Sequence, residues 1–468
     1  MDVAWLAGGV LAFVTRELIA AAAVLIAIGC VDDLLVDCIY IARRCWRAVA
    51  IYSRHERATA DALRPPERPG AMAILIPAWD ESIVIGRMLK GALRRIGHPH
   101  YRLFVGIYPN DPLTLSAVRA IADPRVVPVL VREHGPTNKA HCLNNIWRAV
   151  LAEERGSGVR FKAIVLHDAE DIIHSRELPI FDSLIERFEM VQLPVQPLPD
   201  PQSPWIAGHY LDEFAESHGK DLVVREALGA SVPSAGVGCA IRRETMDQVI
   251  ALNGGVPFDE GSVTEDYELG LKIGALGGKG ALVRLPAASG QMVATREHFP
   301  ATLDAAVRQK ARWLAGIALH GWDRLGWRGG LAERWMRLRD RKAVAGALAT
   351  LFAYMGAVGL GLVLLLDRLW PWLTLPAIIT PDGAIKALLT FNAIMLGWRL
   401  AMRFAFTSSI YGAGEGLRAI PRALVANLIA ILACFRAIGM VARSLRASSG
   451  RPHWDKTAHR FPAILPGE

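Results

Sequence analysis

The stretch from Phe161 to Asp171, FKAIVLHDAED, decides the fold that this sequence predicts. Its first six residues are mostly apolar and predict a strand buried on both faces, as in a parallel sheet, where polar and apolar residues no longer alternate. Three carboxylates follow directly, those of Asp168, Glu170 and Asp171. Ligands of open α/β sheets bind beyond the carboxyl ends of the strands, and hard oxygen ligands suit Mg²⁺ or Mn²⁺. A polar loop with an acidic helix cap explains these residues equally well. The residues after the neighbouring strands are needed to distinguish a metal site from such a loop.

Three further strand and helix pairs precede this stretch. Apolar runs predict strands at 71–76, 103–108 and 126–131, and each is followed by a segment with a helical pattern, at 82–95, 112–122 and 138–152. Strands at intervals of about thirty residues, joined by helices, form right-handed βαβ units. The sequence therefore predicts an α/β domain with a doubly wound sheet.

Polar groups follow each of these strands at the point where the strand ends. Pro77, Asp80 and Glu81 follow the first strand, Asn110 and Asp111 the second, and Lys139 and Asn144 the third. A carboxylate can bind a base edge or ribose hydroxyls, and a lysine can offset the charge of a diphosphate. Each residue alone is also an ordinary turn or cap residue. Their recurrence in all the loops of one sheet edge favours a nucleotide site.

Two later motifs allow both a structural and a chemical interpretation. Thr264, Glu265 and Asp266 precede an amphipathic pattern, so they suffice as the start of a helix. Alternatively, Asp266 is a general base that accepts a proton from an attacking hydroxyl. The stretch from Arg308 to Trp313 is a basic helical segment, typical of a solvated or membrane-surface face. Alternatively, Arg312 clamps a diphosphate and Trp313 stacks on a sugar ring.

Composition points to a soluble domain combined with membrane segments. Hydrophobic residues make up 52% of the 468-residue chain and charged residues 21%, and the mean hydropathy is +0.26. The net charge of +8 comes with arginine clusters that flank apolar runs, which indicates membrane-proximal charge and argues against a nucleic-acid partner. The six cysteines contain no CxxC and predict reduced thiols without a disulfide framework.

Apolar runs predict membrane spans near the N-terminus and after residue 342. The cleanest are 18–31, 343–366 and 387–402. The basic residues after the first run orient the following domain towards the cytoplasm. The run 423–442 is long enough to span but contains Asn427 and Arg436, so it is either a spanning segment or a re-entrant or interfacial one, and we favour an arrangement that keeps the tail inside.

The motifs IPAWDE, HDAED, TED and QKARW, in this order and at these separations, resemble the processive membrane branch of glycosyltransferase family 2. The resemblance implies a GT-A-type domain in which Asp168 and Glu170 are metal ligands for Mg²⁺ or Mn²⁺. It implies that Asp266 is the catalytic base, assisted by Glu265 and Asp168. The nucleotide-sugar site would comprise Pro77, Ala78, Glu81, Asn110, Asp111, Lys139 and Asp168, and the diphosphate and acceptor site Gln309, Arg312 and Trp313. The metal motif departs from the family's usual DAD by reading DAE.

The domain plan that follows has six parts: an N-terminal transmembrane helix 1–42, a juxtamembrane linker 43–70, a cytosolic GT-A domain 71–325, a basic interfacial segment 326–342, a membrane domain 343–442 and a tail 443–468. We expect an inverting glycosyltransferase of the bacterial inner membrane that uses a UDP-sugar, a hexose or N-acetylhexosamine donor, to build and export a cell-surface β-linked polysaccharide. Its expected partners are the UDP-sugar, a glycan acceptor, the lipid bilayer, an outer-membrane export partner and a separate regulatory protein. The alternative is a catalytically silent scaffold or receptor component of an export or phage-adsorption complex.

Overall fold

The computed structural model describes residues 2–373, 375–379, 383–446 and 460–462. Its centre is a seven-stranded mixed sheet with the strand order β3-β2-β1-β4-β7-β5-β8. The strands are β1 (Met72–Ala78), β2 (Tyr101–Ile107), β3 (Val126–Leu130), β4 (Ala163–Leu166), β5 (Met190–Gln192), β7 (Cys239–Arg242) and β8 (Gly280–Leu282). A small second sheet pairs β6 (Val195–Pro197) with β9 (Thr295–Glu297).

The strand before the acidic trio occupies the middle of the sheet. All four residues of β4 are buried, and β4 pairs in parallel with β1 and antiparallel with β7. The four predicted strands are present as the contiguous parallel set β3-β2-β1-β4, although β4 begins at Ala163 and not at Phe161. The antiparallel β7 was not predicted, because a strand of four residues in the sheet centre has no alternating pattern.

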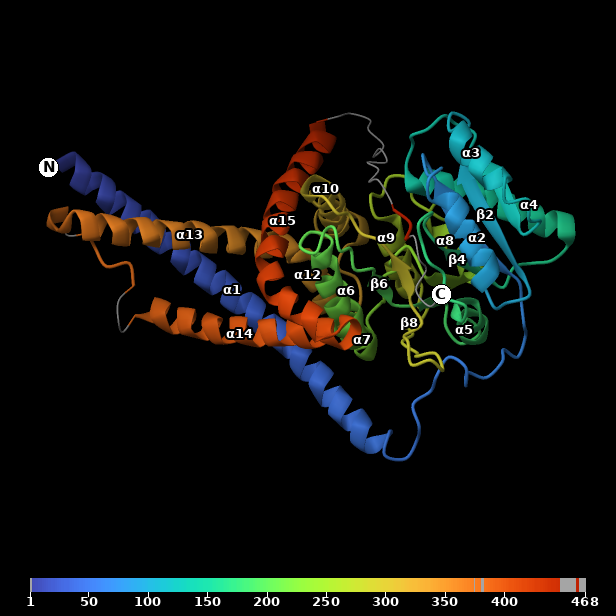
Figure 1. Ribbon diagram of the computed structural model, residues 1–468, viewed down its shortest axis with the longest axis horizontal. Helices are drawn as coiled ribbons and strands as arrows, with labels where there is room; N and C mark the ends of the chain where they lie inside the picture. The colour runs from blue at the N-terminus through green and yellow to red at the C-terminus, as the bar shows by residue number, and fades with distance from the viewer. Residues whose placement is uncertain (1, 374, 380–382, 447–459, 463–468) are drawn as a thin grey trace.

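Helices cover both faces of the sheet, as Figure 1 shows. The apolar side chains of α2 (Ile85–Arg95), α3 (Pro112–Arg119) and α5 (Glu177–Leu184) pack on one face together with Met72, Ile74 and Ile76 of β1. Those of α4 (Lys139–Ser157), α8 (Arg243–Leu252) and α9 (Glu265–Ala275) pack on the other face with Ala73 and Leu75. Successive residues of β1 thus face opposite cores, which is the period of a strand buried on both sides.

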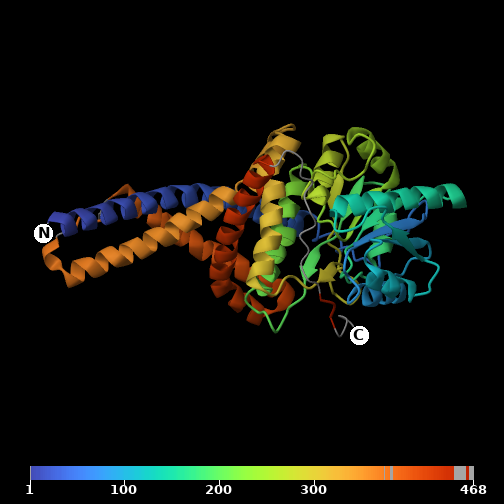
Figure 2. The ribbon, with the colours of Figure 1, turned by 90° about the horizontal axis from the view of Figure 1, so that it is seen from above.

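Four helices are long and apolar enough to cross a membrane: α1 (Asp2–Ala50), α13 (Ala343–Leu369), α14 (Ala384–Tyr411) and α15 (Ala413–Arg446). Helix α1 continues to Ala50, within the segment expected as a linker. Glycines of α13 allow close contact with α1, because a Cβ on Gly356 would meet Ile19 and one on Gly359 would meet Thr15. Figures 1 and 2 show α1, α13 and α14 extending together away from the α/β domain.

Helix α15 contains the ambiguous segment 423–442 and crosses the direction of α1, α13 and α14 in both views. On the side of the α/β domain, Ala433 and Ala437 pack against Ala311 and Ala315, at the end of α10 (Leu303–Trp313) and in the turn that follows. Arg422 of α15 forms a fully buried ion pair with Asp212, at 2.8 Å, on α6 (Gly208–Glu216). Helix α15 therefore joins the long helices to the α/β domain.

The remaining helical segments connect these parts. They are η1 (Ser217–Asp221) and α7 (Leu222–Ala227) after α6, η2 (Leu314–His320) and α11 (Gly321–Leu325) after α10, α12 (Leu331–Arg341) before α13, and η3 (Pro371–Leu373) between α13 and α14. Helix α12 lies in the segment 326–342 that we expected to be interfacial.

Candidate active site

An open cavity of about 1140 Å³, part of it open to solvent, lies beyond the carboxyl ends of β1 and β4. The predicted site residues that line it are Pro77, Glu81, Lys139, Asp168, Glu170, Glu265, Asp266, Gln309, Arg312 and Trp313. These residues come from strand ends, from the first turns of α4 and α9, and from α10. The fold therefore brings together motifs that are far apart in the sequence.

Lys139 is the cation at the centre of the acidic side of the cavity. It is the first residue of α4, and its Nζ lies 2.7 Å from Oδ1 of Asp168. Burial alone would lower the pKa of Lys139, but the carboxylates of Asp168, Asp266 and Glu265 outweigh burial and raise it above its ordinary value. Asp168 and Asp266 thus act on the same buried charge.

Glu265 and Asp266 are the first two residues of α9. Burial, followed by the charge of Asp266, raises the pKa of Glu265 to about 8. Burial also raises the pKa of Asp266, whose Oδ1 accepts a hydrogen bond from the backbone N–H of Tyr267 at 2.7 Å. A carboxylate whose pKa lies closer to neutrality is a better general base.

Thr264 occupies the cap position of α9, but its hydroxyl does not cap the helix. Its Oγ1 is buried without a hydrogen-bond partner among the described residues, and it faces Gly316, where a Cβ would approach to 2.3 Å. The expectation of a simple side-chain N-cap is wrong, because the hydroxyl is turned towards η2 instead of the first helical N–H groups.

Helix α10 contributes Gln309, Arg312 and Trp313 to the cavity wall. The helix begins at a true side-chain cap, where Thr302 accepts from the N–H of Ala305. The indole of Trp313 meets the ring of Tyr210 edge-on, with ring centroids 6.2 Å apart. This basic stretch is therefore not only a solvated face, since one side of it borders the cavity.

Glu297 is a cavity residue that sequence reasoning missed. It ends β9, and burial together with the charges of Asp171, Glu170 and Asp168 raises its pKa well above the ordinary value. Phe214 and Phe299 form an aromatic part of the same wall. No local pattern marks these residues, because they come from separate segments: Glu297 from β9, which pairs with β6, Phe214 from α6, and Phe299 from the loop after β9.

The oxygen-rich side of the cavity fits a divalent cation. Asp168 and Glu170 line it, and burial, followed by the charges of neighbouring carboxylates, raises the pKa values of Glu265 and Glu297. Within the described part of the chain, no three His, Cys, Asp or Glu side chains are arranged to hold a metal by themselves. Mg²⁺ is commonly bound by one or two carboxylates together with water and substrate phosphates.

Asp171 has a different environment from its two acidic neighbours. Its Oδ2 lies 2.6 Å from Nδ1 of His167 and accepts from the N–H of Asp168 at 3.0 Å. The other ring nitrogen of His167 lies 2.5 Å from Glu177, and all three of these side chains are fully buried. Asp171 therefore stabilises the loop that carries Asp168 by accepting a hydrogen bond from its backbone.

Ala78, Asn110 and Asp111 are predicted nucleotide-contacting residues that do not line this cavity. Ala78 is fully buried at the end of β1. Asn110 exchanges two hydrogen bonds of 2.8 Å with the backbone of Gly135. Asp111 caps α3 by accepting from Thr114 N–H at 3.2 Å, and it also accepts from Asp80 N–H at 2.6 Å. These side chains hold the loops beside Glu81.

Comparison with known proteins agrees with this arrangement. Residues 69–316 match the family described as "Glycosyltransferase like family 2". "Bacteriophage adsorption protein B" from Escherichia coli (strain K12) is 36% identical over 463 residues, and the match covers 94% of this chain and 62% of that protein. The adsorption protein B of Escherichia coli O157:H7 gives the same values, so the chain spans less than two thirds of the length of these relatives.

A solved structure shows the same fold. The mannosyltransferase from Pyrobaculum calidifontis, in complex with GDP-Man and Mn²⁺, aligns with a TM-score of 0.52 and 17% identity and covers 88% of this chain and 99% of its own. This likeness confirms the predicted GT-A-type fold. The region matched by the family extends from β1 to α10 and so includes the whole cavity, and the chain belongs to glycosyltransferase-like family 2.

Proposed function

We propose that this protein is an inverting glycosyltransferase that uses a UDP-sugar to extend a β-linked polysaccharide at the cytosolic face of the bacterial inner membrane. The observation that carries the proposal is the convergence of Asp168, Asp266 and Lys139 in one cavity. Three charges from separate motifs in one cavity supply what transfer from a nucleotide sugar uses: a base, a diphosphate partner and a metal ligand.

Asp266 is the proposed general base. It accepts the proton of an acceptor hydroxyl while the hydroxyl oxygen forms a bond to the anomeric carbon of the donor. The bond from that carbon to the diphosphate oxygen breaks, and UDP leaves with the electron pair. A single displacement inverts the configuration, so an α-linked donor gives a β-linkage. The raised pKa of Asp266 supports this role.

The charged residues around Asp266 receive the donor. Lys139 offsets the negative charge of the diphosphate, and Arg312 with Gln309, from α10, binds the same group. Asp168 and Glu170 would hold Mg²⁺ or Mn²⁺, which, when bound, neutralises charge on the leaving UDP. Trp313 offers its ring face to an acceptor sugar, and Glu81 and Pro77 border the nucleotide, with Ala78, Asn110 and Asp111 as the supporting loops.

The long helices beside the cavity support a membrane setting and an exported product. We propose that α1, α13 and α14 span the inner membrane and that α15, which crosses them, lies at the cytosolic interface. The domain plan 1–42, 43–70, 71–325, 326–342, 343–442 and 443–468 remains the proposed organisation, with α1 extending into the linker. A glycan acceptor, an outer-membrane export partner and a regulatory protein belong to the same proposal.

Donor turnover in the purified protein tests this function. The full chain in lipid nanodiscs is given Mg²⁺ or Mn²⁺ and a panel of UDP-hexoses and UDP-N-acetylhexosamines, with GDP-Man as a different nucleotide, and released nucleotide and glycan mass are measured. We expect one donor to be turned over, with at least a hundredfold loss in Asp266→Asn. Asp247→Asn is the matched control, since Asp247 lies on α8 in an exposed ion pair with Arg160. Equal background for wild type and Asp266→Asn with every donor refutes the proposal.

A scaffold without turnover is the second candidate. It is favoured by the relatives' name, which describes adsorption of a bacteriophage. Metal-dependent binding of UDP without transfer of any sugar identifies this case, whereas product glycan identifies the enzyme. The carboxylates of Asp168 and Asp266 favour the enzyme, because both line the cavity in which a metal ligand and a general base are needed.

A further inference from the structure

Helix α12 lies between α1 and the α/β domain and carries interacting side chains on two opposite sides. Trp335, Arg339 and Lys342 follow one another at intervals of four and three residues, so they lie on one side of the helix, with Lys342 at its C-cap. Glu333 and Asp340 are seven residues apart and share the other side. A helix with this pattern can contact α1 with one side and the α/β domain with the other.

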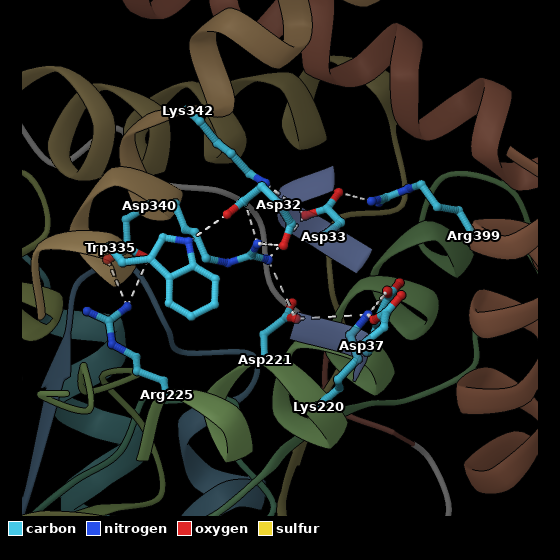
Figure 3. Close-up of polar contacts among 12 residues, drawn as sticks. Asp32, Asp33, Asp37, Lys220, Asp221, Arg225, Trp335, Asp340, Lys342 and Arg399 are labelled. Carbon is cyan, nitrogen blue, oxygen red and sulfur yellow. Dashed lines mark hydrogen bonds and ion pairs between the residues drawn. The ribbon is translucent and has the colours of Figure 1, made fainter. Parts of the chain in front are cut away.

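The first side of α12 holds helix α1 (Figure 3). The indole Nε1 of Trp335 donates to Oδ1 of Asp32 at 2.6 Å, and Arg339 donates to Oδ2 of the same residue at 2.5 Å. Lys342 pairs with Asp32 and, at 2.8 Å, with Asp33. Arg399 of α14 also pairs with Asp33, so this cluster ties together three of the long or interfacial helices.

The second side of α12 holds the α/β domain. Asp340 accepts two hydrogen bonds from Arg225, at 2.9 and 2.8 Å (Figure 3). It accepts a third, of 2.5 Å, from the hydroxyl of Tyr267. Glu333 accepts the backbone N–H of Ser231 at 2.7 Å. Arg225 and Glu333 are both buried, so water competes little with these bonds.

The residues that Asp340 and Glu333 bind, Tyr267 and Ser231, belong to segments that contact Asp266. Tyr267 is the next residue in α9, and its N–H donates to the Asp266 carboxylate. The chain that follows Ser231 passes along α9, where a Cβ on Gly270 would meet Ser234 N at 2.5 Å and one on Gly236 would meet Asp266 Oδ2 at 2.1 Å. Neither Tyr267 nor Asp340 lines the cavity, so neither touches the donor there.

We propose that Asp340 is a positioning residue for Asp266 and that α12 transmits the position of α1 to it. The proposal rests on the proposed function in taking Asp266 as the base. A displacement of about 1 Å in a reacting group lowers a rate by about a hundredfold. Hydrogen bonds to the residue next to Asp266 therefore control turnover, and a membrane helix that holds α12 in place controls it as well.

The test compares Tyr267→Phe, Asp340→Asn and the double variant with wild type, all as the full chain in nanodiscs. Tyr267→Phe removes one hydroxyl and keeps the ring, so it preserves packing. Asp247→Asn is the control, because Asp247 also pairs with two arginines, Arg160 and Arg243, but lies on α8 away from α12. Initial rates give kcat and KM for the donor, and hydrogen exchange is followed in the peptide that covers α9. Arg339→Gln tests the contact with α1 by the same exchange measurement.

We expect both single variants to lower kcat about tenfold at unchanged donor KM. The loss in the double variant should be smaller than the sum of the two single losses, because both changes weaken the hydrogen bond between Tyr267 and Asp340. Exchange at the start of α9 should rise at least fivefold in these variants and in Arg339→Gln, but not in Asp247→Asn. Unchanged kcat and unchanged exchange overturn the inference, as does a change in KM alone. If wild type turns over no donor, the proposed function fails separately, and the exchange measurement alone then decides whether α12 controls α9.

Discussion

Replacing Glu265 by glutamine should stabilise the α/β domain at alkaline pH while it lowers turnover. Glu265 is 7% exposed, lies next to Asp266, and has a buried Oε1 without a hydrogen-bond partner in the described parts of the chain. Its pKa rises from 4.5 to about 8, because burial and the charge of Asp266 oppose ionisation. The folded state therefore holds a proton that the unfolded chain releases.

The sign of the pH dependence follows from that difference. Below pH 4.5 both states keep the proton, so Glu265 contributes no instability, whereas stability falls as pH rises from 4.5 through about 8. At ~1.4 kcal/mol per pKa unit, the full effect above pH 8 is at most about 5 kcal/mol. Solvent in the open cavity reduces it, and we expect a gain of about 2 kcal/mol for glutamine, or ~4–8 °C in Tm for a domain of this size.

The measurement is the Tm of the full chain in nanodiscs, followed by tryptophan fluorescence at pH 5 and pH 8.5. We expect Glu265→Gln to match wild type at pH 5 and to exceed it at pH 8.5. Glu268→Gln on the same helix is the control with the opposite sign. Glu268 is 1% exposed and paired with Arg324 and Lys272, so its neutralisation removes two ion pairs from a buried carboxylate and lowers Tm. An equal Tm shift for Glu265→Gln at both pH values, or a lower Tm at pH 8.5, refutes the reasoning.

Three further changes test other parts of the structure. Lys139→Met removes the cation that Asp168 contacts and should raise the donor KM at least tenfold in initial-rate measurements; an unchanged KM contradicts its role. Gly236→Ala places a Cβ 2.1 Å from Asp266 Oδ2 and should reduce kcat about a hundredfold, whereas Gly254→Ala, with a similar positive φ but open space around it, should retain kcat. Arg422→Leu leaves the buried Asp212 carboxylate without its closest partner and should destabilise the protein by about 3–5 kcal/mol, as loss of Tm; a double change with Asp212→Asn should recover part of it, and the absence of any recovery contradicts the pairing.

Much of the fold and the site was predictable from local patterns. The run before Asp168 has the composition of a strand covered on both faces, and β4 is central with all its residues buried. Parallel strands end at one sheet edge, so the residues after them were expected to meet, and Lys139, Asp168 and Glu81 do line one cavity. Only the family resemblance assigned the later motifs, at Asp266 and Trp313, to that site. In the structure both residues line the same cavity.

Other features depend on contacts that no local pattern contains. Asp111 and Glu297 are both acidic residues near strand ends, yet Asp111 caps a helix while Glu297 lines the cavity. Thr264 is a residue type that favours a helix N-cap, yet its hydroxyl makes no hydrogen bond to the first N–H groups of α9. The direction of α15 across the other long helices, and the two-sided contacts of α12, arise from packing between segments that are far apart in the sequence, 73 residues for Tyr267 and Asp340 and 303 for Asp32 and Trp335.

The sequence by itself determined the strands, the long apolar helices and the kinds of groups at the sheet edge, because hydrophobic period and turn chemistry are set by neighbours along the chain. Only the tertiary structure decided which carboxylates line the open cavity and which, like Asp171, hold its loops in place without lining it. Burial, charge proximity and hydrogen bonding depend on distances through space, and these distances set the pKa of Glu265 and link Asp340 to Asp266 through Tyr267.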